Sequence, residues 1–177
     1  QSYVLNTRRD QFKDVRVRRA LIHAIDRELL TRTVLDGLAP VIDGAIQPLS
    51  WAYTDSVRKY PYDVATAKSL LDEAGWTDAN NDGLREKDGT PLAFTLMTQA
   101  GFAIRENIAQ AVQKQLKDVG VDVKIQLVDG TSISSLWFEG KFDAMLHWWH
   151  MPSDPEITLF FASDRTPPAG RNINYVA

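Results

Sequence analysis

The residues best suited to chemistry lie in the segment 142–155, FDAMLHWWHMPSDP. His147 and His150 are three residues apart, a spacing that suits a shared metal ion on a helix. The alternating apolar pattern around them instead predicts a strand, in which these two side chains point in different directions. The sequence therefore predicts no metal site and no bound cofactor here.

Three carboxylates in or beside this segment could serve as general acids or bases: Asp143, Asp154 and Glu156. Nothing in the sequence pairs them with a nucleophile, and the chain lacks the G-x-S-x-G, phosphate-binding glycine-loop and H-E-x-x-H motifs. A hydrolytic enzyme is therefore only an alternative hypothesis. It requires one of these carboxylates within hydrogen-bond distance of His147 or His150.

Trp148 and Trp149 are adjacent indoles at the end of the predicted strand. Neighbouring strand residues face opposite sides, so we expect at least one indole to face a cleft or an interface. An apolar platform beside His150 suits the binding of a small organic molecule or peptide without catalysis. The alternative is that one indole packs in the core and the other caps a neighbouring helix.

The strand that carries this platform is predicted from its alternation. One face is expected to carry Phe142, Ala144, Leu146 and Trp148. The opposite face is expected to carry Asp143, Met145, His147 and Trp149.

The elements that position the strand follow an α/β pattern. Strands over 92–99 and 121–128 enclose a helix over 104–119, which predicts a right-handed crossover and a parallel pair. A brief helix over 133–139 leads into the strand at 142. Nearer the amino terminus we expect a strand at 3–5, a helix over 15–35 capped by Asp14 and ended by Gly37 and Pro40, and a helix from Asp63 to Gly75. The predicted fold is a mixed sheet flanked by helices.

The helix over 15–35 is rich in arginine, a composition found on nucleic-acid-binding faces. Acidic residues alternate with these arginines, which favours a solvated, ion-paired surface. A nucleic-acid-binding module is therefore a less favoured alternative, and binding that weakens steeply with salt would indicate it.

Residues 38–62 show no periodicity and predict a long structured loop. Its Trp51 is expected to pack as a wedge against the domain, with a ligand contact as the alternative. The stretch 78–89 resembles the start of a calcium loop, but its twelfth position is Gly89 instead of a glutamate. A turn followed by a hairpin is the favoured interpretation.

Composition sets the remaining limits. The 177 residues carry a formal net charge of −3, include no cysteine, and contain no window of about 18 apolar residues that could span a membrane. We expect one domain over 1–177, cut from a longer protein.

Four stretches resemble the family 5 solute-binding proteins, of the oligopeptide, dipeptide and nickel type, which serve ABC importers. They are FKDVRVRRALIHAIDRELL at 12–30, YDVATAKSLLDEAGW at 62–76, DANNDGLREKDGTPLAFTL at 78–96 and GKFDAMLHWWHMPSDP at 140–155. The resemblance covers nearly the whole chain in the family's order.

This resemblance implies that the chain is most of the carboxy-terminal lobe of a two-lobed, periplasmic or surface-anchored binding protein. The amino-terminal lobe and a helical tail after 172–175 are then missing, and the partners are a solute and the importer's membrane permease. Ligand contacts are expected from Trp149, His150, Trp148, Thr131 and Asn6. Peptide-binding members carry an acid soon after the tryptophan, whereas His150, Met151 and Pro152 follow Trp149 here. The solute is thus expected to be a peptide held without that contact, or another small organic compound.

Overall fold

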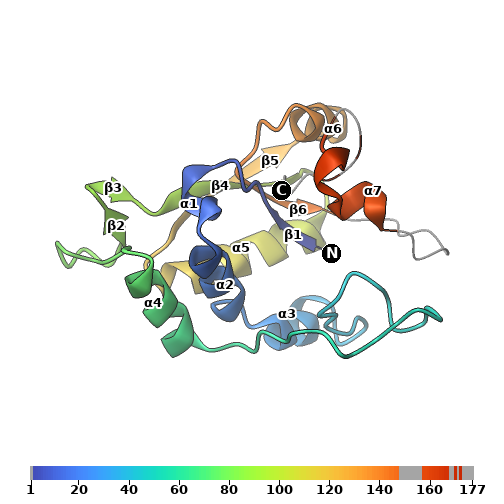
Figure 1. The fold of residues 1–177 in the computed structure, drawn as a ribbon, viewed down its shortest axis with the longest axis horizontal. Coiled ribbons are helices and arrows are strands. Elements are labelled where there is room, and N and C mark those ends of the chain that lie inside the picture. Colours follow the sequence, from blue (N-terminus) through green and yellow to red (C-terminus); the bar gives the residue numbers. More distant parts are fainter. Residues whose placement is uncertain (1, 148–156, 168–169, 171, 173–177) are drawn as a thin grey trace.

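The structure is a computed structural model that describes residues 2–147, 157–167, 170 and 172. Its main sheet has four strands in the order β1-β6-β4-β5 (Figure 1). Their bounds are β1 Ser2–Leu5, β4 Ala93–Gln99, β5 Asp122–Val128 and β6 Ala144–His147.

The strands β4, β5 and β6 run parallel to one another, and β1 is antiparallel to β6. The register of β4 on β5 runs from Ala93 opposite Asp122 to Gln99 opposite Val128. The predicted parallel pair around a helix is therefore confirmed, and the sheet is mixed as expected.

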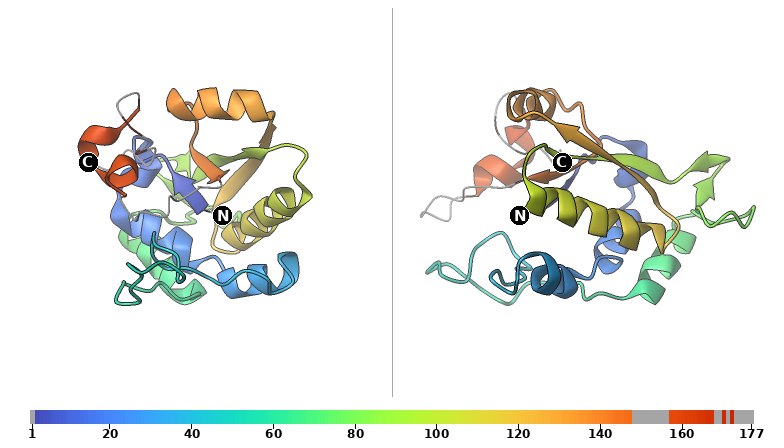
Figure 2. Two further views of the ribbon diagram at one scale, coloured as in Figure 1. Left: turned by 90° about the vertical axis from the view of Figure 1, so that its right-hand side faces the viewer. Right: turned by 180° about the vertical axis from the view of Figure 1, so that it is seen from behind.

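Helices cover both faces of this sheet, as the two turned views show (Figure 2). The face on which α5 packs is also covered by the amino-terminal helices, and α6 covers the opposite face. The bounds are α1 Asp10–Lys13, α2 Val15–His23, α3 Arg27–Val34, α4 Val64–Glu73, α5 Ala103–Lys117 and α6 Gly130–Phe138. A short helix α7 (Thr158–Phe161) and the 3-10 turn η1 (Ser163–Arg165) follow later in the chain.

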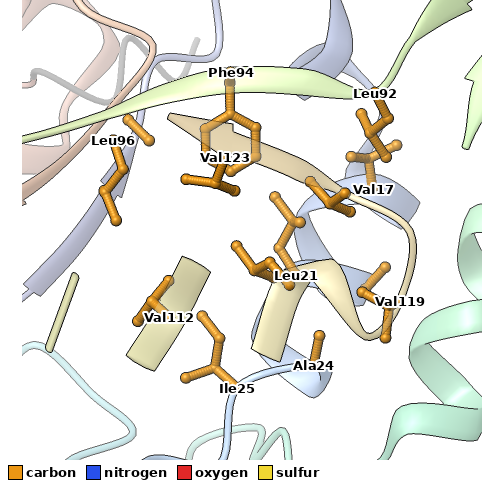
Figure 3. Close-up of a cluster of buried hydrophobic side chains, with 14 of the residues drawn as sticks. Val17, Leu21, Ala24, Ile25, Leu92, Phe94, Leu96, Val112, Val119 and Val123 are labelled. Atoms are coloured by element: carbon orange, nitrogen blue, oxygen red, sulfur yellow. The ribbon is translucent and has the colours of Figure 1, made fainter. Parts of the chain in front are cut away.

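The larger hydrophobic core lies between the sheet and helices α2, α4 and α5. Phe94, Leu96 and Val123 extend from the sheet toward side chains of α2 and α5, including Leu21 and Val112 (Figure 3). All of these side chains are nearly inaccessible to solvent. Their spacing of three and four on the helices and two on the strands is the pattern from which both were predicted.

A second core lies under α6 and contains Phe142 with Met145 and Trp137. The prediction that Phe142 shares a face with Ala144 and Leu146 is wrong, because β6 begins only at Ala144. The alternation holds within the strand itself, where Ala144 and Leu146 face the larger core and Met145 faces α6.

The single helix predicted over 15–35 is divided into α2 and α3. Asp14 caps α2 as expected, but Asp26 starts a new helix because its carboxylate accepts a hydrogen bond from the Leu29 backbone N–H at 2.8 Å. Its own backbone N–H donates to the side chain of Gln115 on α5. The break turns Leu29 toward solvent, at 40% exposure, and buries Leu30 instead.

The stretch 78–89 ends in a two-stranded hairpin, β2 (Glu86–Lys87) with β3 (Thr90–Pro91), so the hairpin prediction is confirmed. Asp88 and Gly89 connect the strands with positive φ angles of 51° and 72°, as a tight two-residue turn requires. The side chains of Asp78, Asn80 and Asp82 accept backbone N–H groups of the same loop. They act as turn-forming residues.

Residues 38–62 form neither helix nor strand, as predicted, and project at the end of the molecule where β1 begins (Figure 1). Trp51 is 85% exposed, so the prediction that it packs as a wedge is wrong. Its alternative role as a ligand contact stays a prediction. None of the helices in the described ranges combines the length and the apolar character needed to cross a membrane.

Candidate functional site

The carboxyl ends of β4, β5 and β6 lie together at one edge of the sheet. The chain passes from β4 to β5 through α5 on one face, then from β5 back to β6 through α6 on the other face. Open α/β sheets bind their ligands outside the carboxyl ends of the strands, at the point where successive crossovers run in opposite directions. We call this region, formed by residues 99–105, 129–132 and 147, the carboxyl edge.

Gln99 and Arg105 form the part of the carboxyl edge that follows β4. Gln99 is the last residue of the strand, and its side-chain oxygen accepts a hydrogen bond of 2.9 Å from Nη1 of Arg105. The guanidinium carbon of Arg105 lies 4.6 Å from the centre of the Phe102 ring. These two contacts hold a cation above the end of β4.

The start of α6 forms the part that follows β5. Asp129 caps this helix by accepting the backbone N–H groups of Thr131 and Ser132 and the Thr131 hydroxyl. Hydrogen bonds from the Ser132 and Thr131 side chains, and then from their backbones, keep the pKa of Asp129 well below its usual value. Thr131 is exposed at this edge, as its predicted ligand contact requires, with its hydroxyl already bonded to Asp129.

His147 ends β6 and lies against Trp137 of α6, with 5.0 Å between the ring centres. Burial lowers the pKa of the His147 imidazole, and the positive charge of Arg105 lowers it further. Because β6 pairs in parallel with β4, the end of β6 lies beside the end of β4, above which Arg105 is held. Trp137 itself is buried and stacks on Phe138 at 4.9 Å.

Three of the predicted ligand contacts, Trp148, Trp149 and His150, lie outside the described residues. They directly follow His147 in the chain. Their ligand contacts therefore stay predictions, as does the choice between the platform and the core arrangement for the two indoles.

Asn6 is placed inside the fold. Its side chain is 1% exposed, and its amide donates to the backbone oxygens of Gly140 and Phe142 at 3.1 and 2.9 Å. Its side-chain oxygen accepts the backbone N–H of Arg8. These bonds tie the end of β1 to the turn before β6, and a ligand contact by Asn6 stays a prediction.

Asp143, a carboxylate proposed for the enzyme alternative, forms an ion pair with Arg9 at 2.9 Å and accepts the Thr95 backbone N–H at 3.1 Å. It precedes β6, whereas His147 ends that strand. The other proposed carboxylates, Asp154 and Glu156, lie outside the described residues. Within the described ranges, no group of three or more His, Asp or Glu side chains is arranged to hold a metal ion.

The arginine-rich stretch over 15–35 engages acids and backbone oxygens. Arg16 pairs with Asp14 at 2.6 Å and Arg27 pairs with Asp43 at 2.8 Å. Such pairing fits the predicted solvated, ion-paired surface.

A cavity of about 570 Å³ lies on the face of the sheet covered by α2, α3 and α5. Its walls include Tyr3, Arg19, Ile42 and Val112. Burial raises the pKa of the Tyr3 hydroxyl. Among the predicted ligand contacts that fall in the described residues, neither Thr131 nor Asn6 lines this cavity.

Sequence reasoning missed Gln99 and Arg105. Gln99 was assigned to the end of a strand, and Arg105 to the apolar helix that follows. Their place in the sequence, at and just after the end of a predicted parallel strand, could have indicated them, because polar residues at the carboxyl ends of parallel strands meet at one edge.

The mixed sheet with helices on both faces places the chain in the α/β class and matches the architecture of periplasmic binding protein structures. Residues 1–167 match the family described as "Bacterial extracellular solute-binding proteins, family 5 Middle". The chain belongs to this family.

Two relatives match nearly the whole of this chain but only part of their own length. The chain is 39% identical over 175 residues to the oligopeptide-binding protein AppA of Bacillus subtilis, covering 97% of the chain and 32% of that protein. It is 32% identical over 165 residues to the nickel-binding periplasmic protein of Escherichia coli, covering 92% of the chain and 31% of that protein. The chain thus spans about a third of the length of these relatives.

Solved structures agree with this assignment. AppA from Bacillus subtilis, in complex with a nonapeptide, superimposes with a TM-score of 0.95 at 38% identity, over 99% of this chain and 35% of that one. NikA from Brucella suis, in complex with Fe(III)-EDTA, gives a TM-score of 0.85 at 34% identity, over 98% of this chain and 34% of that one.

Proposed function

We propose that residues 1–177 form most of the carboxy-terminal lobe of a two-lobed protein that captures a solute for an ABC importer. The observation that carries this proposal is the carboxyl edge, where β4, β5 and β6 end together and β6 leads directly into Trp148, Trp149 and His150. Two findings support the assignment to one lobe: the chain belongs to the family, and it matches about a third of the length of its relatives.

In the proposed mechanism the carboxyl edge is one wall of a cleft and the amino-terminal lobe is the other. Hinge closure brings the walls together around the solute. Trp149 stacks on the solute, while Thr131 and His150 orient it through hydrogen bonds. The closed protein then delivers the solute to the permease, from the periplasm or from the outer face of the membrane.

The proposed solute is a peptide or another small organic compound. The relatives include the oligopeptide-binding AppA, the nickel-binding protein of Escherichia coli and the glutathione-binding protein GsiB of Salmonella typhimurium, so the scaffold serves more than one cargo. The residues after Trp149 are His150, Met151 and Pro152, which offer no carboxylate for a peptide's amino terminus.

We propose that the protein binds its solute without catalysing a reaction. Its family is one of solute-binding proteins. The engagement of Asp143 with Arg9 and with the Thr95 backbone also supports a structural role for that carboxylate.

The test is a thermal-shift screen of the full-length protein against peptides, sugars and amino-acid derivatives, followed by titration of the best binder. A solute that binds only the folded state raises the Tm, and the rise grows with the logarithm of the ratio of solute concentration to Kd once that ratio is well above one. Trp149→Ala is expected to weaken binding at least tenfold. The matched control Tyr62→Ala removes an aromatic side chain that is 50% exposed beside α4 and should leave binding unchanged. Equal binding by wild type and Trp149→Ala would refute the proposed stacking.

A further inference from the structure

Arg105 occupies a defined position at the carboxyl edge. It lies in the first turn of α5 and is partly buried. Gln99 accepts one of its N–H groups, and the Phe102 ring lies beside the guanidinium group, with Phe102 itself 47% exposed. A strand end and an aromatic ring therefore fix the orientation of the cation before any solute arrives.

The charge of Arg105 has no anionic partner among the described residues, since no ion pair between them includes it. The neighbouring Glu106 accepts the backbone N–H of Gly101 at 2.9 Å. Asp129, the acid at the start of α6, is used in capping that helix. The carboxylates of Glu106 and Asp129 thus accept hydrogen bonds from backbone N–H groups and do not pair with Arg105. The guanidinium group is therefore available to another anion.

We infer that Arg105 binds an anionic group of the solute, and that the solute carries a carboxylate. This inference rests on the proposed function and adds to it the chemical class of the cargo. The guanidinium fork presents two parallel N–H groups to a carboxylate. Gln99 accepts from Nη1 only, so within the described residues the Nη2 group and the remaining N–H groups of Arg105 have no hydrogen-bond acceptor. Arg105 is therefore a specificity-determining residue at the edge.

Gln99 acts as the positioning residue for this contact. A Cβ atom added at Gly130 would lie 2.6 Å from Nε2 of Gln99, so the first residue of α6 leaves room for the amide. Gly130→Ala is expected to displace the end of the Gln99 side chain and, with it, the acceptor that orients Arg105. Its effect on carboxylate binding should be smaller than that of removing the guanidinium.

The test uses the full-length protein and two matched probe pools. One pool holds synthetic peptides of uncharged residues with a free carboxyl terminus, together with simple aliphatic and aromatic carboxylates. The other holds the same compounds as amides. Binding is measured by thermal shift and then by calorimetric titration, for wild type, Arg105→Gln and the control Lys117→Gln. Lys117 is exposed at the far end of the same helix and should have no effect.

The expected result is that wild type and Lys117→Gln bind a carboxylate at least tenfold more tightly than its amide, and that Arg105→Gln binds both equally. A loss of discrimination at unchanged Tm is a result that a purely structural role does not produce.

If Arg105→Gln still prefers the carboxylate, or if wild type binds acid and amide alike, the inference is wrong. If wild type binds a neutral sugar and no carboxylate, the inference fails while solute capture stands. If no solute binds, the proposed function fails as well.

Discussion

Single polar residues fix the amino end of β6, opposite the carboxyl edge. Asn6 joins β1 to the turn before β6 through buried hydrogen bonds, and Asp143 joins the same turn to Arg9 and β4. The sequence indicated that Asn6 closes a strand, but only the structure shows which backbone oxygens its amide reaches. Contacts between residues more than 130 positions apart leave no local pattern in a sequence.

Asn6→Ala is expected to lower the free energy of unfolding by about 1–3 kcal/mol, because it removes the amide donor shared by the backbone oxygens of Gly140 and Phe142, of which Phe142 keeps only the bond from Nε of Arg9. Denaturant unfolding measures this loss. Asn107→Ala, at an exposed position on α5, is the control and should change stability little. Full stability with reduced solute affinity would instead favour the predicted ligand contact of Asn6.

The pKa of the His147 imidazole depends on the charge of Arg105. Its pKa lies below the ordinary 6.5, first because the ring is buried and second because Arg105 is positively charged. Arg105→Gln is therefore expected to raise the pKa of His147 while leaving it below 6.5, since burial remains. NMR titration of the imidazole measures the change, with His147→Gln used to assign the signal. An unchanged pKa in Arg105→Gln would show that the two groups do not interact.

The lowered pKa of His147 also determines how the free energy of unfolding changes with pH. The folded state binds a proton at His147 less readily than the unfolded state does, so protonation favours unfolding. The stabilising contribution is complete above pH 6.5 and declines as the pH falls from 6.5 toward the lower pKa of the folded protein. The difference between wild type and His147→Gln isolates this contribution from that of the carboxylates.

At the scale of elements, the sequence predicted most strands and helices because their apolar periods are clear. The crossover from β4 through α5 to β5 and the hairpin at 86–91 follow from local patterns and turn residues. The division of the first long helix was not predicted, because Asp26 follows an apolar stripe that continues without interruption. Its capping bond and the contact from Gln115 decide the break, and the second of these comes from a distant helix.

The turn between α5 and β5 depends on a glycine. Gly120 has a φ angle of +84°, and its backbone oxygen accepts the Arg85 N–H at 2.8 Å. An added Cβ would lie 2.8 Å from Cγ of Arg85, whose guanidinium is bonded to the backbone oxygens of Val119 and Trp76. The side chain of Arg85 is therefore not free to move away.

Gly120→Ala is expected to destabilise the protein by about 1–3 kcal/mol, because both the backbone conformation and the contact with Arg85 are unfavourable. Thermal unfolding measures the loss. Gly83→Ala is the matched control, since Gly83 has a similar φ angle of +86° but nothing near its added Cβ. A loss of equal size in both variants would assign the effect to backbone strain alone.

At the scale of the whole molecule, the sheet order brings together three strand ends that are far apart in sequence. Composition and periodicity predicted the α/β class, and the resemblance predicted the family. The closeness of the end of β6 to the end of β4, where Gln99 holds Arg105, depends on β6 lying next to β4, an order that no single segment specifies. The residues most relevant to solute chemistry were therefore harder to predict than the scaffold that carries them.

The central claim is that the carboxyl edge forms one wall of a solute-binding cleft. Hydrogen exchange of the full-length protein, with and without the best binder from the solute screen, tests it most directly. We predict slower exchange of backbone amides in residues 99–105, 129–132 and 147–150 when the solute is bound. Protection confined to the cavity under α2 and α3, with no change at the carboxyl edge, would contradict the account.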